Sequence, residues 1–302
     1  MRALVIYNSF SGKNKVAKRI DYVINKLKTK YDIVDFFKSF SPNSISECLD
    51  LDRVNYDLVL AVGGDGTVHE VVNAIMKSKS RPTLAFIPNG TCNDSAKSLG
   101  LRRSLKRNIK KILAGNSKSI DIYKINDSYF VYGLACGCLT EISYDADHNI
   151  KRNLGKFAYY LEGVKRLKKT RPVNIELEYD NKFITGEFSL FLALNSRYLA
   201  GFKLHRSERI YLDDGYIRIT LIKKTNKLMN IIDFGMFLLI GDNYKHNILT
   251  FNVKNFKIKS EKTISYNTDG EKYGDTKEVD VNCIPKALNV ILTKRVNRRH
   301  FL

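Results

Sequence analysis

Residues 57–67 read Asp-Leu-Val-Leu-Ala-Val-Gly-Gly-Asp-Gly-Thr, a short apolar run that breaks into a glycine-rich turn. The apolar part has the length and composition of a buried β-strand. Apolar residues then recur at helical spacing, at Val68, Val71, Val72 and Ile75. Thr67 and Glu70 have the spacing of a capping box, so we expect a helix to begin at this turn. The stretch therefore predicts a strand, a tight turn and a helix.

The same alternation of apolar runs and helical patterns extends over residues 1–125. Runs that predict strands occupy 3–7, 33–37, 58–62 and 84–87, and a helical pattern covers 16–27. Strands and helices in this order are typical of a parallel sheet with helices on both faces. We therefore predict an α/β domain over residues 1–125.

The hydrophobic period changes to two in the second half of the chain. Apolar and polar residues alternate over 173–179, 217–221 and 251–253, which indicates an antiparallel sandwich or barrel. One helical pattern, over 157–167, interrupts this β-rich half. We predict a second, all-β domain over residues 126–285.

The turn at 63–67 suits a bound phosphate. Glycines at a strand-to-helix turn let backbone N–H groups approach an anion closely, and the helix N-terminus adds favourable electrostatics. Asp65 would repel a phosphate unless a divalent cation bridged them, so one interpretation is that Asp65 holds magnesium, directly or through water. The other is a tight turn with Asp65 as a local cap. The turn alone does not decide between them.

A second turn, Pro88-Asn-Gly-Thr-Cys-Asn-Asp94, follows the predicted strand at 83–87, and Gly100 is placed to end a short helix after it. In a parallel sheet both turns lie at the carboxyl ends of strands, where ligands of open α/β sheets bind. Taken alone, Asn93 and Asp94 are also typical helix caps. The first turn of the chain, Asn8-Ser-Phe-Ser-Gly-Lys13, ends a strand as well, and Lys13 is placed to reach a phosphate.

The chain has 302 residues, with 51 Lys+Arg against 31 Asp+Glu, a formal excess of +20. Such an excess favours a polyanionic partner such as nucleic acid, an anionic membrane face or nucleotide phosphates. No helix-turn-helix, zinc-finger or RNA-binding signature accompanies the charge, so we do not expect nucleic acid as the partner. Basic runs at 97–118 and 151–171 fit either an anionic lipid surface or ordinary solvated helix faces.

Cysteine usage and hydropathy indicate a cytoplasmic location. Five cysteines, at 48, 92, 136, 138 and 283, lack the paired spacing of a zinc site and are expected to be reduced thiols. The N-terminal apolar run is too short for a signal peptide. The longest apolar run, 231–241, contains Asp233 and is shorter than the roughly 20 residues that a spanning helix needs. We expect any membrane contact to be peripheral, at the inner face.

Four motifs occur in the order Gly63-Gly-Asp-Gly-Thr67, Pro88-Asn-Gly-Thr-Cys-Asn-Asp94, Asp213-Asp-Gly215 and Thr268-Asp-Gly-Glu271. In this order and spacing they resemble the diacylglycerol kinase catalytic family, particularly its soluble bacterial lipid kinases. The first motif is shared with NAD kinases and similar to one in phosphofructokinases, whereas the Asp-Gly-Glu separates the lipid kinases. The resemblance implies an NAD kinase/phosphofructokinase-like α/β domain, a C-terminal β-sandwich, and a tail at about 286–302 that packs back on the first domain.

The resemblance also assigns roles to residues. It places Asp65 on the catalytic magnesium–phosphate assembly and Asp269 and Glu271 on the catalytic acid pair, with Glu271 as general base. Asp94 and Asp121 fall in an adjoining acidic network, and Asp214, with the carbonyls of Tyr211 and Tyr216, falls on a structural magnesium site. The implied nucleotide-binding set is Asn8, Ser9, Gly12, Lys13, Gly63, Gly64, Gly66, Thr67, Gly90, Thr91, Asn93 and Asp94.

For two of these assignments a purely structural role stays open as an alternative. Without the resemblance, Asp269-Gly-Glu271 is an ordinary hairpin turn, and Asp214 is a solvated turn acid. The chain also departs from the family pattern: Ser9 stands where proline is expected, and Ser95 and Lys97 stand where an apolar residue and arginine are expected. Lysine cannot reproduce the bidentate fork of arginine.

The resemblance implies ATP and Mg²⁺ as cofactors, a membrane lipid as acceptor, and a homodimer as a common assembly. Diacylglycerol, giving phosphatidic acid, is the expected acceptor, although monoacylglycerol, a sphingoid base, a glycolipid or a polyprenol also offers a hydroxyl. An NAD kinase-like enzyme is one competing hypothesis, but its Thr-Gly-Ser-Thr-Ala-Tyr-type motif is missing. A non-catalytic lipid- or nucleotide-binding regulator is another, and the retention of Asp65, Asp269 and Glu271 argues against it.

Overall fold

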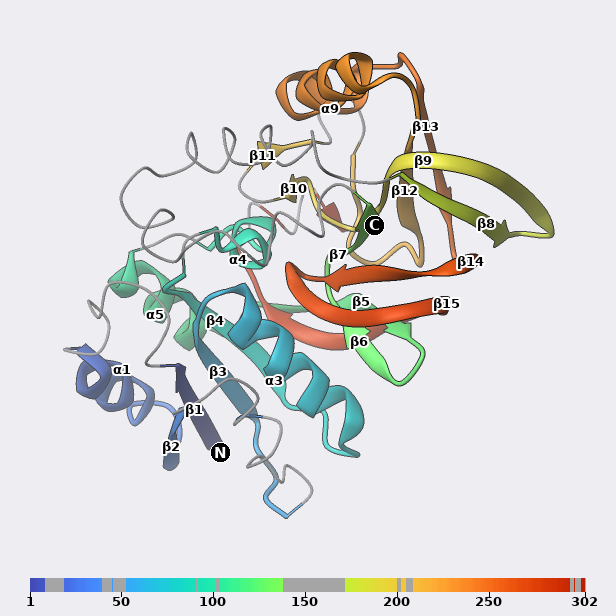
Figure 1. Cartoon of the computed structure of the whole chain (residues 1–302). Helices are drawn as coiled ribbons and strands as arrows, with labels where there is room; N and C mark the ends of the chain where they lie inside the picture. Colours follow the sequence, from blue (N-terminus) through green and yellow to red (C-terminus); the bar gives the residue numbers. More distant parts are fainter. Residues whose placement is uncertain are drawn as a thin grey trace. The chain divides into compact units, whose positions relative to one another are not determined.

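The computed structural model in Figure 1 describes residues 1–8, 19–39, 45, 53–90, 92–101, 104–137, 172–199, 202–204, 209–293, 296, 300 and 301. The chain divides into two compact units. Unit 1 contains Met1–Ile122, Tyr211–Asp214 and Pro285–Leu302, and unit 2 contains Tyr123–Ile210 and Gly215–Ile284. The short segment Tyr211–Asp214 thus belongs to unit 1, although nothing in the period-two pattern separated it from the β-rich half.

Unit 1 is built on a parallel sheet. Its elements are β1 (Arg2–Asn8), α1 (Ile20–Leu27), β2 (Ile33–Ser39), β3 (Leu58–Gly63), α3 (Asp65–Lys77), β4 (Thr83–Pro88), α4 (Asp94–Ser98) and α5 (Leu105–Ala114). The strands are parallel in the order β4-β3-β1-β2. The last part of β15 (Glu271–Ile291) extends this sheet, because Val290 pairs in parallel with Leu84 of β4. The predicted parallel sheet is confirmed.

Helices cover both faces of this sheet (Figure 1). Alternate residues of β1, beginning with Ala3 and Val5, share one buried cluster with α1 and α5. The intervening residues, such as Leu4 and Ile6, are also buried, and α3 packs against β3. A strand covered on both sides has no solvated face, which explains why β1, β3 and β4 are apolar throughout. The edge strand β2 instead exposes side chains such as Phe36.

Unit 2 is antiparallel. Its elements are β5 (Ser117–Ile125, which begins in unit 1), β6 (Ser128–Phe130), β7 (Gly133–Gly137), β8 (Val173–Tyr179), β9 (Lys182–Leu194), β10 (Tyr198–Leu199), β11 (Phe202–Lys203), β12 (Ile217–Lys223), α9 (Lys227–Ile240), the 3₁₀ turn η2 (Gly241–Asn243), β13 (Ile248–Val253), β14 (Asn255–Thr268) and the first part of β15. The main order is β13-β12-β9-β7-β14-β15. The antiparallel half predicted from the period-two pattern is confirmed.

Helix α9 covers one face of β9 and β12, and the sequence did not predict it. Phe234, Phe237 and Leu238 pack into a buried cluster with strand residues such as Leu192 and Ile222. The apolar run at 231–241 is too short for a membrane span, and in the structure most of it belongs to this helix over a sheet. Within the described residues no helix is both long and apolar enough to cross a bilayer. The helix predicted over 157–167 lies outside the described residues.

The capping-box prediction at Thr67 is wrong. Helix α3 begins at Asp65, with Gly64 in extended conformation as its N-cap and without a side-chain cap hydrogen bond. Thr67 is therefore inside the first turn, where its hydroxyl accepts a hydrogen bond from Asn8 Nδ2 at 3.1 Å. A helix start at this glycine turn is nevertheless confirmed.

Gly100 ends helix α4 as the sequence predicted. Its φ is +69°, and the amides of Gly100 and Leu101 donate to the carbonyls of Lys97 (3.0 Å) and Ala96 (2.8 Å). This pair of bonds is a Schellman motif, which needs a left-handed residue at the first position after the C-cap. A Cβ on Gly100 would lie 2.5 Å from Thr293 Oγ1 and 2.6 Å from a methyl of Val296. The C-terminal segment of unit 1 therefore packs closely over this turn.

We predict that Gly100→Ala destabilises the protein more than Gly115→Ala. Both glycines have nearly the same positive φ, so the backbone strain of roughly 1–2 kcal/mol is shared. A Cβ on Gly115 meets only the flexible end of Lys30, whereas at Gly100 the clash with Thr293 and Val296 adds about 1–3 kcal/mol. Urea denaturation of the two variants gives the difference. Equal losses of unfolding free energy would mean that the C-terminal segment does not pack there.

Candidate functional site

Two glycine turns of unit 1 touch at the carboxyl ends of β3 and β4. The Asn89 amide donates to the Gly63 carbonyl at 2.8 Å, which carries the strand pairing into the turns. A Cβ built on Gly90 would lie 2.6 Å from the Gly64 Cα, and one on Gly63 would lie 2.2 Å from Thr67 Oγ1. Distances below 3 Å exclude side chains, so the close approach of these turns requires glycine.

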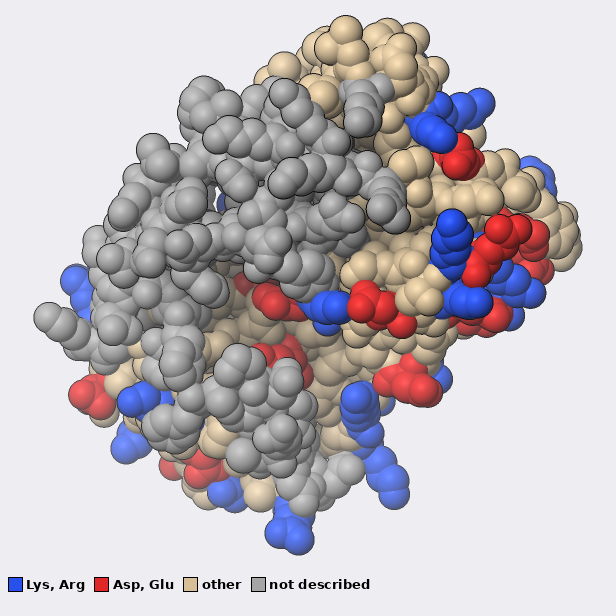
Figure 2. Space-filling model, viewed as in Figure 1, with Lys and Arg blue, Asp and Glu red and all other residues tan. Residues whose placement is uncertain are grey.

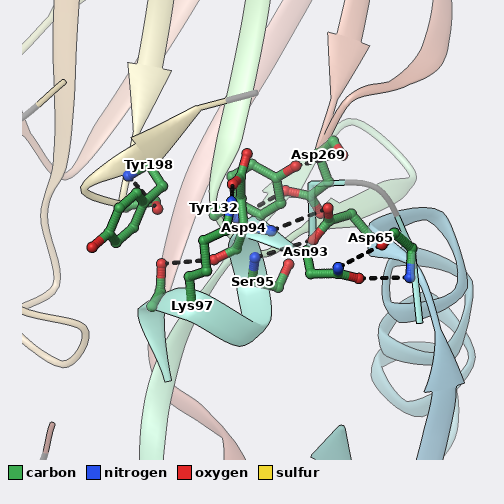
Figure 3. A network of polar contacts seen from close by, with 11 residues as sticks. Asp65, Asn93, Asp94, Ser95, Lys97, Tyr132, Tyr198 and Asp269 are labelled. Carbon is green, nitrogen blue, oxygen red and sulfur yellow. Dashed lines mark hydrogen bonds and ion pairs between the residues drawn. The ribbon is translucent and has the colours of Figure 1, made fainter. Parts of the chain in front are cut away.

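This approach brings the Asp65 carboxylate to the N-terminus of α4 (Figure 3). Its Oδ2 accepts from the Asp94 amide and its Oδ1 from the Ser95 amide, both at 3.1 Å. The carboxylate thus takes two of the N–H groups that a helix start leaves without partners inside the helix. Ser95 was not among the predicted site residues, because a contact made through a backbone amide leaves no trace in the residue type.

The electrostatics of Asp65 are unusual. Burial raises the pKa of its carboxyl to about 6, and the neighbouring Asp94 carboxylate adds to the rise, while the amide hydrogen bonds oppose it. A buried acid with a raised pKa beside a second acid favours a bound cation, because the cation would offset the negative charge of both groups. The Asp94 side chain, almost fully buried, accepts from Lys97 Nζ at 2.7 Å.

Asn93 shapes the second turn instead of capping α4 with its side chain. It is left-handed, with φ of +54°, and helix α4 begins after it without a side-chain cap bond. Its Oδ1 accepts from the Gly90 amide at 2.8 Å, and its Nδ2 donates to the Gly90 carbonyl at 2.7 Å. These two bonds close the turn around Gly90. Asn93 thus occupies the N-cap position of α4, as the helix-cap interpretation expects, but its side chain makes no cap hydrogen bond.

The remaining predicted nucleotide ligands divide into two groups. Asn8 ends β1 and bonds to Thr67, which connects the first strand to the turn at 63–67, and Gly66 lies in the first turn of α3. Ser9, Gly12, Lys13 and Thr91 lie outside the described residues. Next to Asn8 in β1, the Tyr7 hydroxyl is buried and makes no hydrogen bond within the described part of the chain, and burial raises its pKa.

In unit 2, Asp269 holds a loop with its carboxylate (Figure 3). Its Oδ1 accepts from the amides of Tyr132 (2.8 Å) and Gly133 (3.1 Å), and its Oδ2 accepts from the Val131 amide at 2.9 Å. The Tyr132 hydroxyl donates to the Asp269 carbonyl at 2.7 Å. With both oxygens engaged and only 3% of the residue exposed, Asp269 is suited to positioning the chain.

The hairpin interpretation of Asp269-Gly270 is correct as geometry. Thr268 pairs with Glu271 across the β14–β15 ladder, which leaves a two-residue loop with φ of +53° and +88°. Two positive φ values with an Asp-Gly sequence are typical of a type I′ turn. Glu271 is the first residue of β15 and is exposed. The turn therefore holds one acid in the interior and presents the other to solvent.

The other predicted acids, Asp121 and Asp214, come from other segments of the chain. Asp121 is fully buried in unit 1 and accepts from the Lys286 amide at 2.8 Å. Tyr211 and Asp214 are in the short segment of unit 1, and Tyr216, in unit 2, accepts from the Tyr123 hydroxyl at 2.8 Å through its carbonyl. Among the described residues, no cluster of three or more His, Cys, Asp and Glu gathers into a metal site. The assignments to the acidic network and the structural magnesium remain predictions.

Comparison with known proteins identifies the family. Residues 2–125 match the diacylglycerol kinase catalytic domain, and residues 137–292 match the YegS C-terminal NAD kinase beta sandwich-like domain. A diacylglycerol kinase of Bacillus subtilis is 32% identical over 297 residues, covering 97% of each chain, and one of Staphylococcus saprophyticus is 34% identical over 279 residues, covering 90% of this chain and 89% of its own length.

Solved structures agree with this match. A diacylglycerol kinase from Bacillus anthracis has a TM-score of 0.80 at 25% identity over 98% of both chains. An NAD kinase from Archaeoglobus fulgidus in complex with ATP has a TM-score of 0.56 at 14% identity, covering 99% of this chain and 96% of its own, which shows a shared fold. The predicted NAD kinase-like architecture is thus confirmed, and the chain belongs to the diacylglycerol kinase family of lipid kinases.

Proposed function

We propose that the protein transfers the γ-phosphate of ATP to the hydroxyl of diacylglycerol, giving phosphatidic acid, with Mg²⁺ as the cofactor. The observation that carries the nucleotide part is Asp65, a carboxylate with a pKa raised to about 6 between two touching glycine turns. The relatives named diacylglycerol kinase support the acceptor.

The residues around Asp65 fit a magnesium ion. Mg²⁺ prefers oxygen ligands and is usually held by one or two carboxylates together with substrate phosphates, so a cluster of three acids is not required. The ion would neutralise and orient the triphosphate. In this proposal Asp65 holds the ion, directly or through water. The backbone amides of Gly63, Gly64 and Gly66 face the phosphates. Gly90 lets the second turn approach closely while its own amide bonds to Asn93, and Asn8, Thr67 and Asn93 support the turns.

Glu271 acts as the general base. Phosphoryl transfer asks the protein mainly to position groups, and a carboxylate takes the proton of the attacking hydroxyl. The acceptor oxygen forms its bond to the γ-phosphorus as the bond to the β-phosphate oxygen breaks and ADP leaves. Glu271 is suited to receive the proton because it is exposed, and Asp269 fixes the turn that presents it. Asp269 is therefore a positioning residue.

Three further parts of the proposal rest on the resemblance. Asp94 and Asp121 would form the acidic network near the metal, and Asp214, with the carbonyls of Tyr211 and Tyr216, would bind a structural Mg²⁺. Ser9, Gly12, Lys13 and Thr91 would contact the nucleotide.

The enzyme would act in the cytoplasm at the inner, anionic membrane face, where its lipid acceptor resides. Helix α5 supports peripheral binding, because Lys106, Arg107 and Lys110 are exposed while Ile109 and Ile112 are buried. Each well-placed cation contributes on the order of 1 kcal/mol at an anionic surface. The lipid, not nucleic acid, would then be the partner of the +20 charge, and the enzyme would assemble as a homodimer.

We predict that Glu271→Gln slows the transfer step by roughly 10²–10⁴, the usual contribution of general acid–base catalysis, while ATP binding and stability stay unchanged. Single-turnover transfer to diacylglycerol in mixed micelles, together with the thermal midpoint, measures both effects. Glu278→Gln removes an exposed acid from the same strand and serves as the control. An unchanged transfer rate in folded Glu271→Gln would refute its assignment as the base.

Asp269→Asn should behave differently. An amide nitrogen cannot accept from a backbone N–H, so at least one of three hydrogen bonds is lost and unfolding free energy falls by about 1–3 kcal/mol. Because the loop then no longer positions Glu271, kcat should fall while the KM for ATP is kept. A purely structural turn would instead lose stability and retain kcat per folded molecule, which is the contrary outcome.

The raised pKa of Asp65 predicts how stability depends on pH. Folded Asp65 binds its proton more tightly than the unfolded chain does, so its contribution to stability is lost as pH rises from about 4 to about 6. Asp65→Asn cannot ionise. The unfolding free energy of the variant relative to wild type should therefore increase by about 1–3 kcal/mol between pH 4 and pH 7.5, taking two pKa units as an upper bound.

Urea denaturation without nucleotide at the two pH values tests this expectation, and Asp127→Asn, which removes an exposed carboxylate, gives the baseline. MgATP at pH 7.5 should stabilise wild type more than Asp65→Asn. Asp65→Ala should in addition abolish nearly all turnover. A pH-independent difference between wild type and Asp65→Asn would contradict the raised pKa, and near-normal turnover of folded Asp65→Ala would contradict its metal role.

A further inference from the structure

Helix α9 is apolar on the face that it turns to solvent. Leu228 is 68% exposed, Leu239 55%, Ile232 42% and Ile240 37%, and they are four of the nine large apolar side chains that are exposed in the described part of the chain. With about 100° between successive helix residues, Leu228, Ile232 and Leu239 lie within about 40° of one another. They therefore form one stripe, which we call the α9 stripe.

The opposite face of α9 already has its partner. Phe234, Phe237 and Leu238 pack on β9 and β12 in a buried cluster. A helix at the surface of a soluble protein normally carries charged residues on the side away from its core. Here that side carries leucine and isoleucine, so packing among the described residues of unit 2 does not account for the α9 stripe.

The only acidic residue of α9, Asp233, is buried beneath the surface. Asp233 is fully buried, and its carboxylate accepts from the Tyr244 hydroxyl at 2.6 Å and from Asn247 Nδ2 at 3.0 Å and lies 2.9 Å from His246 Nδ1. Figure 2 shows the surface of α9, at the top of the view, without the colour of Asp or Glu on the face that is visible. No exposed carboxylate of α9 would therefore oppose an anionic surface.

Lysines flank the helix at both ends. Lys223 and Lys224 precede α9, Lys245 follows η2, and all three are exposed; Lys224 pairs with Glu187 at 2.6 Å. An apolar stripe between cations is the pattern of a helix that lies in the interface of an anionic bilayer. A second copy of the chain fits this particular surface less well, because it would bring the same exposed lysines against those of the first copy.

We propose that the α9 stripe inserts into the headgroup–acyl boundary of an anionic bilayer and docks the enzyme there. This inference rests on the proposed lipid kinase function for its biological sense, but not for its test. Leu228, Ile232 and Leu239 would enter the acyl boundary, while Lys223 and Lys245 contact anionic headgroups. The occupant of this surface is thus a lipid bilayer.

The chain contains no tryptophan, so a single introduced indole reports on one position. In the full chain, Leu239→Trp should shift its fluorescence to shorter wavelength on mixed phosphatidylglycerol–phosphatidylcholine vesicles and should be quenched by brominated acyl chains. Phe183→Trp, at a residue that is 61% exposed at the start of β9, should do neither. Equal responses of both positions, or no response at Leu239→Trp, would overturn the proposal.

The combined variant Leu228→Ser, Ile232→Ser and Leu239→Ser should bind the same vesicles roughly 10²-fold more weakly. This figure assumes that each apolar side chain is about half buried in the bilayer and that serine removes that contribution. Phe183→Ser is the matched control and should bind as wild type does. Turnover on short-chain diacylglycerol in detergent micelles should be unchanged. Unaltered vesicle binding, or a change of oligomeric state without a change in vesicle binding, would overturn the proposal.

These arms also separate the inference from the proposed function. If wild type phosphorylates no diacylglycerol in micelles but the combined variant loses vesicle binding, the kinase proposal fails and the docking surface stands. If turnover is normal and vesicle binding does not depend on the α9 stripe, the reverse holds.

Discussion

The close approach of Gly64 to Gly90 determines the geometry of unit 1. A Cβ on Gly90 would lie 2.6 Å from the Gly64 Cα, and one on Gly64 would be tight at 3.3 Å from the Gly90 Cα. The turns after β3 and β4 therefore lie against each other, and the N-termini of α3 and α4 are brought together. The amides of Asp94 and Ser95 then reach the Asp65 carboxylate. The fold thereby holds an acid where burial disfavours its charge. Such local conflict with stability is expected where a protein binds ions and phosphates.

Two acids at the turn between β14 and β15, in unit 2, have opposite surroundings. Asp269 is buried and its oxygens accept three backbone amides, whereas Glu271, two residues later, is exposed at the start of β15. The Asp-Gly turn makes this possible, because both central residues have positive φ and the next residue begins the returning strand. The hairpin geometry is therefore compatible with the role that we propose for Glu271, because the turn would hold a base in place.

Local sequence patterns predicted the fold well where a backbone conformation requires a particular residue type. The run at 57–67 indicated strand, turn and helix, and Gly100 was expected at the end of α4, where φ is +69°. The start of α3 was misplaced because Gly64 takes the N-cap position and Thr67 bonds to Asn8, 59 residues away in sequence. The three amides that hold Asp269 come from a loop about 137 residues away, which no local pattern could indicate. Helix α9 was missed because an apolar run does not reveal which face meets a sheet.

The proposed transfer of phosphate from ATP to a lipid can be tested by offering the protein several acceptors at once. Wild-type protein is incubated with Mg²⁺ and ATP labelled in its γ-phosphate. The acceptors are present at equal concentrations: diacylglycerol, monoacylglycerol and a sphingoid base in mixed micelles, and NAD in solution. We expect the label to appear in phosphatidic acid, to depend on Mg²⁺ and to be absent with Asp65→Ala. Label in NADP, or in no acceptor at all while ATP binds, would contradict it.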